Sequence, residues 1–181
     1  MKATGIVRRI DDLGRIVVPK EIRRTLRIRE GDPLEIFTDR DGEVILKKYS
    51  PIGEMGEFAR QYADSLAQTT GHIVAVADRD QWIAASGGAK KELLQKPITH
   101  QLEKAIEERK SFVAAAGSKD YCNITDDGER YAYEAVSPII CEGDAIGVVV
   151  ILTKDSQEKF GETENKLAAS ASGFLGRQME A

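Results

Sequence analysis

The chain has 181 residues, of which 41% are hydrophobic and 31% charged, and its formal net charge is −4. This composition excludes a chain that is disordered throughout and leaves room for one large or two small domains. The longest apolar run, 145–152 with Gly147 included, is far shorter than the roughly 18 residues that a membrane-spanning helix needs.

The first residues, MKATGIVRRIDDLGR, lack the apolar stretch and the small-residue cleavage site of a secretory signal. We therefore expect a cytoplasmic protein. Only two cysteines occur, Cys122 and Cys141, and they have no metal-ligand spacing. Both are expected to be reduced, buried thiols, and neither a metal nor another cofactor is predicted.

The first 50 residues predict two strands, a short helix and a hairpin. Apolar and polar residues alternate imperfectly at 5–10, and 15–18 is a run of mostly β-branched residues. Both patterns favour strands, with a turn between them at 12–14. Pro19 suits the first position of a helix, KEIRRTL, whose apolar face leaves Arg23 and Arg24 pointing away. Strands at 34–38 and 44–48 flank Asp41-Gly42, which is typical of a type I′ hairpin turn.

A segment of this size cannot build a stable core by itself. Its only aromatic residues are Phe37 and Tyr49, and it has neither disulfides nor a metal site. The remaining route to stability is a second copy, so we expect an obligate, intertwined dimer.

The best domain boundary lies in the segment from Tyr49 to Gly53, which carries a proline and a glycine, and we divide the chain into 1–52 and 53–181. The second region predicts an α+β domain, an antiparallel sheet with helices packed on it. Its expected helices are 54–70, 99–109 and 162–179, and its expected strands are 72–78, 82–86, 112–115, 131–140 and 145–152. The first and last helices either pair with each other within a chain and again across a dimer, or each simply covers its own sheet.

Nothing in the sequence supports catalysis. There is no nucleophile elbow, P-loop, HExxH or dinucleotide-binding glycine pattern, and His72 and His100 have no neighbouring acid or nucleophile. The acidic run 126–129 lacks the ligand register of a calcium loop and predicts a solvated turn.

Charge is distributed unevenly along the chain. Residues 1–52 hold 12 Lys and Arg against 9 Asp and Glu, whereas the remainder holds 14 against 21. Residues 1–29 alone hold nine basic side chains, seven of them arginines, against three acidic ones. Arginine is favoured where a planar fork grips phosphate or a base edge, which points to nucleic acid. A solvated face that pairs with acids of a partner subunit is the alternative.

Arg8 and Arg15 flank the turn at 12–14, and Arg23 and Arg24 project from the predicted helix. A symmetric dimer would double them to eight guanidinium groups on one surface. A helix this short makes a deep recognition-helix mode less natural than backbone gripping with arginines that dip into a groove. We therefore expect affinity from phosphate contacts and selectivity from DNA shape.

The blocks TGIVRRIDDLGRIVVPKEIRRTLRI and GDPLEIFTDRDGEVILKKY resemble the swapped-hairpin DNA-binding domain of the AbrB-type transition-state regulators, a group that includes MazE-like antitoxins. The resemblance implies an interleaved dimer whose strands form one barrel on double-stranded promoter DNA. It also implies DNA contacts by the arginines that match the motif, Arg8, Arg15, Arg23 and Arg24, with Arg9 at a position that is commonly basic.

Over its whole length the chain resembles sporulation regulators that join this domain to a GAF-like domain. That resemblance implies an activator and repressor of late sporulation genes, with tetramers built from helices of the GAF-like part, and a GAF ligand that the sequence does not identify. Two other hypotheses stay open: an antitoxin whose C-terminal region binds a toxin, and an enzyme that uses Cys122 or Cys141.

Overall fold

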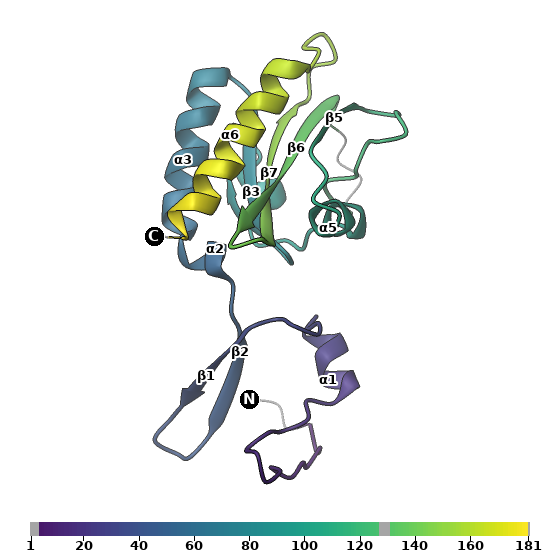
Figure 1. Cartoon of the computed structure of the whole chain (residues 1–181). Coiled ribbons are helices and arrows are strands. Elements are labelled where there is room, and N and C mark those ends of the chain that lie inside the picture. The colour runs from purple at the N-terminus through teal and green to yellow at the C-terminus, as the bar shows by residue number, and fades with distance from the viewer. Residues whose placement is uncertain (1–3, 127–130, 181) are drawn as a thin grey trace. The chain divides into compact units, whose positions relative to one another are not determined.

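The computed structural model describes residues 4–126 and 131–180. The chain forms two compact units, Met1–Tyr49 and Ser50–Ala181 (Figure 1). This division lies three residues before the expected one, because Ile52 is fully buried in the core of the second unit.

The first unit contains helix α1 (Lys20–Thr25) and the antiparallel strands β1 (Leu34–Thr38) and β2 (Val44–Lys48). The predicted helix and the predicted hairpin are therefore confirmed. Pro19 is the N-cap residue of α1 and not its first helical residue, so the helix begins one residue later than expected.

The predicted type I′ turn at Asp41-Gly42 is wrong. A type I′ turn needs positive φ at both residues, but only Gly42, at φ 82°, has it. The Asp39 carboxylate accepts hydrogen bonds from the backbone N–H groups of Asp41 and Glu43, at 3.0 and 2.9 Å. These bonds stabilise a longer loop, in which Asp39 N–H also bonds to Glu43 O.

The predicted strands at 5–10 and 15–18 do not form within one chain. An extended segment becomes a strand only when a partner satisfies its backbone groups. The described residues of the single chain pair these segments only at the turn, where Asp11 N–H donates to Arg15 O at 3.0 Å. Their apolar side chains are left exposed, Val7 by 84% and Val17 by 71%.

The second unit is built on an antiparallel five-stranded sheet with strand order β4-β3-β7-β6-β5. Its strands are β3 (Ile73–Asp78), β4 (Trp82–Ala85), β5 (Phe112–Ala115), β6 (Tyr133–Cys141) and β7 (Asp144–Thr153). All five expected strands are thus confirmed, with ends that differ by one or two residues. The β6–β7 turn is of the I′ kind, since Glu142 and Gly143 have φ of 48° and 86°.

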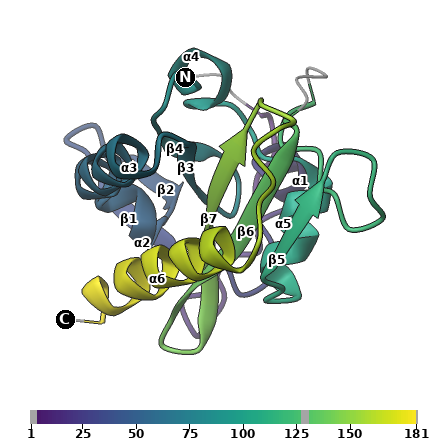
Figure 2. The same cartoon turned by 90° about the horizontal axis from the view of Figure 1, so that it is seen from above.

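Helices cover both faces of this sheet (Figure 2). The helices are α2 (Pro51–Glu54), α3 (Gly56–Thr70), α4 (Lys90–Leu93), α5 (His100–Glu107) and α6 (Glu162–Gln178). Buried side chains alternate along β3: Val74 and Val76 face the core beneath α3 and α6, whereas Ala75 and Ala77 face the core beneath α5. The expected helix at 54–70 is confirmed as α3, which begins two residues later, whereas α2, in the expected boundary segment, and α4 were not predicted.

Helices α3 and α6 contact each other and also cover the sheet. The rings of Tyr62 and Phe174 stack with centroids 5.1 Å apart. The backbone of α6 closely approaches the end of β6, because a Cβ on Gly176 would overlap the carbonyl oxygen of Ile140. Within one chain these helices therefore both pair with each other and cover the sheet, and their pairing across a dimer stays a prediction.

Candidate nucleic-acid interface

The turn between the first two segments is organised by Asp11. Its Oδ1 accepts hydrogen bonds from the backbone N–H groups of Leu13 and Arg15, at 3.0 and 2.8 Å. Gly14, at φ 76°, supplies the left-handed conformation that closes the turn, and its N–H bonds to Asp11 O. The turn therefore holds the backbone of Arg15 in a defined place.

The same carboxylate also binds the Arg15 side chain, whose Nε lies 2.7 Å from Asp11 Oδ2. The Arg15 backbone N–H and the Arg15 guanidinium hold the pKa of the Asp11 carboxyl below its usual range. The Arg15 side chain is still 70% exposed. Sequence reasoning identified Arg15 and missed Asp11, although its place four residues before Arg15 was a usable signal.

Arg8 and Arg9 lie on the extended segment before this turn, and both are exposed. Arg8 Nη1 donates to the carbonyl of its neighbour Val7 at 3.0 Å. Among the described residues, no hydrogen bond or ion pair of the Arg9 side chain is present. Both guanidinium groups are therefore accessible to an anionic partner.

The two arginines of α1 differ from each other. Arg24 is exposed, as its predicted position requires, but Arg23 is half-buried and its Nε is shielded from solvent without a hydrogen-bond partner among the described residues. Helix α1 thus presents Arg24 fully and Arg23 only in part.

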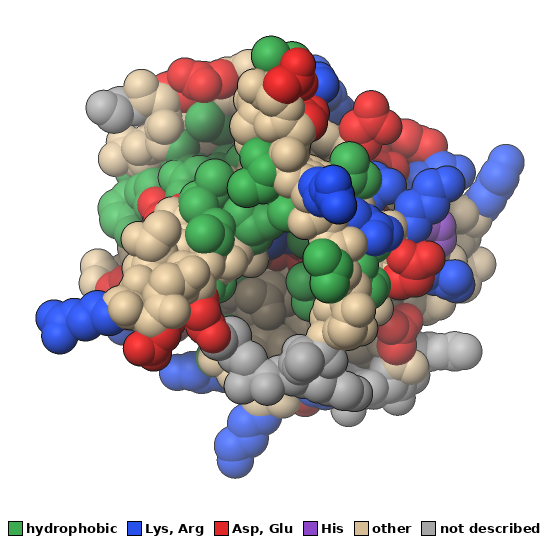
Figure 3. All heavy atoms as spheres, turned by 90° about the horizontal axis from the view of Figure 1, so that it is seen from below, with side chains coloured by type: hydrophobic (Ala, Val, Ile, Leu, Met, Phe, Trp, Pro, Cys, Tyr) green, Lys and Arg blue, Asp and Glu red, His purple; other side chains and the backbone are tan. Residues whose placement is uncertain are grey.

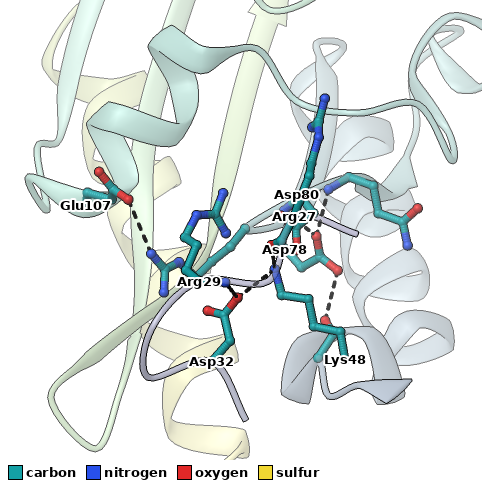
Figure 4. Close-up of polar contacts among 10 residues, drawn as sticks. Arg27, Arg29, Asp32, Lys48, Asp78, Asp80 and Glu107 are labelled. Atoms are coloured by element: carbon teal, nitrogen blue, oxygen red, sulfur yellow. Dashed lines mark hydrogen bonds and ion pairs between the residues drawn. The ribbon is translucent and has the colours of Figure 1, made fainter. Parts of the chain in front are cut away.

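A buried ion pair fixes the chain that follows α1. Asp32 Oδ2 accepts hydrogen bonds from Arg29 N–H at 2.8 Å and from Lys48 Nζ at 3.0 Å (Figure 4). Burial alone would raise the pKa of Asp32, but these two donors keep it below its usual value. Lys48 Nζ also donates to Arg27 O at 2.9 Å, next to the end of α1. Lys48 therefore has a structural role in linking β2 to α1.

Apolar side chains of the first unit are uncovered in the single chain. Figure 3 views the molecule from below and shows hydrophobic side chains, in green, exposed on that side. In the hairpin, apolar side chains lie on both faces, since Ile36 and Leu46 alternate with Phe37 and Ile45. The exposed set in this unit is Ile6, Val7, Ile10, Leu13, Ile16, Val17, Leu26, Ile36, Phe37, Val44, Ile45 and Leu46.

The second unit brings together no group of three or more metal-ligating side chains within the described ranges. The acidic run at 126–129 lies mostly outside the described residues.

Both cysteines are free and half-buried. Burial, followed by the nearby Glu134, raises the pKa of the Cys122 thiol to about 11. His72 Nδ1 lies 3.5 Å from Glu158 Oε2, and His100 Nδ1 lies 3.4 Å from Glu103 Oε2.

Sequence reasoning missed Glu134, a fully buried carboxyl on β6. Burial raises its pKa to about 8, against the opposing effect of a hydrogen bond from Cys122 N–H. Its place two residues before the buried Val136 of the same strand was the available signal.

Two families match the chain. "Stage V sporulation protein T C-terminal, transcription factor" matches residues 54–180, and "Antidote-toxin recognition MazE, bacterial antitoxin" matches residues 7–54. Within residues 4–126 and 131–180, no helix is both long enough and apolar enough to cross a membrane.

The chain is similar to stage V sporulation protein T of Bacillus subtilis (strain 168), with 58% identity over 182 residues that cover 99% of each protein. Its N-terminal part is similar to transition state regulatory protein AbrB of the same organism, with 63% identity over 51 residues, which are 28% of this chain and 52% of AbrB.

A solved structure shares the fold of the second unit. The GAF domain of Thermosynechococcus elongatus PixJ, in its blue-light absorbing form, matches with a TM-score of 0.56 and 11% identity, over 74% of this chain and 89% of that domain. The expected GAF-like architecture of the second unit is thereby confirmed.

Proposed function

The chain belongs to the family of stage V sporulation protein T, and we infer that it is a DNA-binding transcriptional regulator of sporulation that holds its DNA through Arg8, Arg9, Arg15, Arg23 and Arg24. In this proposal it activates some late sporulation genes and represses others, and it acts in the cytoplasm on double-stranded promoter DNA.

One observation carries the arginine assignment. Arg8, Arg9, Arg15 and Arg24 are exposed and lie within residues 7–54, which match the MazE family, and 51 residues of this chain are 63% identical to AbrB. Phosphate contacts by arginine position a protein on the duplex, and contacts to base edges and sensitivity to DNA shape add sequence preference. The partial shielding of Arg23 suggests that it becomes fully available only when a second chain rearranges its surroundings.

The uncovered apolar residues of the first unit support a dimer through that unit. An apolar surface on both faces of a two-stranded hairpin is unstable in water, and a second copy is the partner of matching chemistry. In this proposal the strands that one chain leaves unpaired, 5–10 and 15–18, pair in a barrel shared by two chains. Helices of the second unit then join two dimers into a tetramer.

A salt titration tests the arginine assignment. Each lost phosphate contact should reduce the slope of log affinity against log salt by about 0.9. We expect Arg15→Ala and Arg23→Ala, in the full chain, to weaken binding to a sporulation promoter and to flatten this slope. Unchanged affinity and slope in both variants would reject the assignment.

The antitoxin alternative receives support from the MazE match at residues 7–54. The second unit counts against it, since a folded sheet with two buried cores differs from a flexible segment that wraps a toxin. Slow amide exchange throughout β3, β6 and β7 would favour the regulator.

The GAF-like unit is proposed to regulate DNA binding rather than to catalyse a reaction. The raised pKa values of Cys122 and Cys141 disfavour the thiolate that a cysteine nucleophile requires. A small ligand in this unit, of unidentified chemistry, would act by changing the affinity of the first unit for DNA.

A further inference from the structure

We propose that Asp11 is a positioning residue for DNA recognition, which holds one edge of the Arg15 guanidinium and leaves the other edge free for the nucleic acid. The inference rests on the proposed DNA contact of Arg15. The interaction of Asp11 with Arg15 adds a cause of sequence specificity to the proposed contacts of the arginines with DNA.

The carboxylate of Asp11 is held in a fixed position. Its Oδ1 accepts two backbone hydrogen bonds, from Leu13 and Arg15, and its own backbone donates to Arg15 O and accepts from Gly14 N–H. A carboxylate tied to the turn in this way cannot rotate without losing those bonds. Oδ2 therefore offers one acceptor site in a defined direction, and Arg15 Nε occupies it at 2.7 Å.

The contact through Nε determines which donors remain. A guanidinium carries five N–H groups, one on Nε and four on the two Nη nitrogens. Among the described residues, Asp11 is the only side chain bonded to the Arg15 guanidinium, and it uses Nε. The N–H groups on the two Nη nitrogens remain available to donate to DNA. A bidentate contact to phosphate, or to O6 and N7 of guanine, requires two parallel N–H groups of this kind.

Arg15 differs from the other four arginines in this respect. Arg8 is bonded by an Nη nitrogen to its neighbour's carbonyl, and no carboxylate holds Arg9, Arg23 or Arg24 in the described part of the chain. Arg15 alone combines an anchored Nε with an exposed side chain.

The expected benefit is selectivity rather than fold stability. An ion pair this exposed contributes little to folding. It restricts a flexible side chain before DNA arrives, which lowers the cost of ordering it in a bidentate contact. The negative charge of Asp11 also repels phosphate, so it weakens binding to unrelated sequences that offer charge alone.

The test measures the ratio of two affinities in the full chain. One duplex is selected by the wild-type protein from a random pool, and the other is a scrambled duplex of equal composition. Asp11→Asn keeps one oxygen, which can serve the turn or the guanidinium but not both. Asp12→Asn is the matched control, because it removes the same charge from the neighbouring exposed residue.

We expect Asp12→Asn to tighten binding to both duplexes and to leave their ratio unchanged. Asp11→Asn should tighten binding to the scrambled duplex but lower the ratio about tenfold, which is the order of one bidentate base contact. In an Arg15→Lys background, Asp11→Asn should no longer change the ratio, since the lysine ammonium lacks the planar fork of N–H groups that a bidentate contact uses.

A spectroscopic measurement on the free protein separates positioning from a general charge effect. The Nε–H resonance of Arg15 should shift in Asp11→Asn and stay in place in Asp12→Asn. An unshifted resonance, or equal ratios in the two variants, would overturn the inference.

The failure of the inference can be told apart from failure of the proposed function. If Arg15→Ala loses the ratio while Asp11→Asn retains it, Arg15 contacts DNA and Asp11 does not position it. If Arg15→Ala changes neither duplex affinity, the DNA contact of Arg15 is itself wrong and the inference falls with it.

Discussion

The backbone N–H of Cys122 donates a 2.6 Å hydrogen bond to Oε1 of Glu134 in the interior of the second unit. Glu134 is fully buried, and its Oε2 is buried without a hydrogen-bond partner among the described residues. The ionised form is therefore poorly solvated, and burial raises the pKa of Glu134 to about 8.

Glu134 should make the second unit less stable as the pH rises. The ordinary pKa of a glutamate carboxyl is 4.5 and that of Glu134 in the folded chain is about 8, so between these values the folded chain binds a proton that the unfolded chain has lost. The free energy of unfolding should fall across this window and level off above it. By the conversion of about 1.4 kcal/mol per pKa unit, the loss is at most about 5 kcal/mol.

Glu134→Gln should remove this pH dependence, because the amide stays neutral and its oxygen can still accept from Cys122. Urea unfolding at pH 5.5 and 8.5, monitored by the fluorescence of the single, buried Trp82, measures the free energy of unfolding at each pH. We expect the variant to exceed the wild type in stability at pH 8.5. Equal pH slopes in the two proteins would contradict the assignment.

Cys122 should react slowly with alkylating reagents. Its pKa of about 11, against an ordinary value of 9.0, implies a thiolate fraction at pH 8 that is about 100-fold lower than that of an unperturbed thiol. Iodoacetamide labelling followed by mass spectrometry should therefore modify Cys141 before Cys122. Since Glu134 is the second cause of this raised pKa, Glu134→Gln should accelerate labelling of Cys122, and an unaltered rate would count against the coupling.

Gly176 is expected to tolerate no side chain. Alanine there would bring Cβ into overlap with Ile140 O, so α6 would have to move away from the sheet, at a cost on the order of 2 kcal/mol or more. Gly173→Ala is the control on the same helix: its Cβ would meet only Arg177 Nη1, at 3.6 Å, and helix propensity favours alanine by about 1 kcal/mol. Thermal unfolding should lower the Tm of the first variant and keep or raise that of the second.

The proposed dimer predicts an unusual effect for Ile36→Asp. Ile36 is 66% exposed in the single chain, where an acid should change stability by no more than about 0.5 kcal/mol. If a second copy covers Ile36, the same acid is buried without a partner, and association should be lost. Light scattering should give a smaller mass for Ile36→Asp than for Arg40→Asp, an exposed position in the loop of the same hairpin. Equal masses would reject the dimer surface.

Local sequence patterns were sufficient for most of the fold. Alternation and helical spacing predicted all five strands of the second unit and the helix at His100–Glu107, because each buries one face against a core of the same chain. The strands expected at 5–10 and 15–18 are not formed in the single chain, and their pairing in a dimer stays a prediction. Local patterns failed at Asp41-Gly42, where the carboxylate of Asp39 satisfies the N–H groups of the loop.

Sequence patterns alone were enough to locate the arginine-rich segment, to place Arg15 beside a turn and to predict the antiparallel α+β character of the second unit. These features depend on neighbours a few residues apart. The folded structure was needed to show that Asp11 occupies Nε of Arg15, that Arg23 is shielded, and that Glu134 is buried beside Cys122. These properties depend on the distances between the groups and on their solvation in the folded chain, and local sequence patterns specify neither.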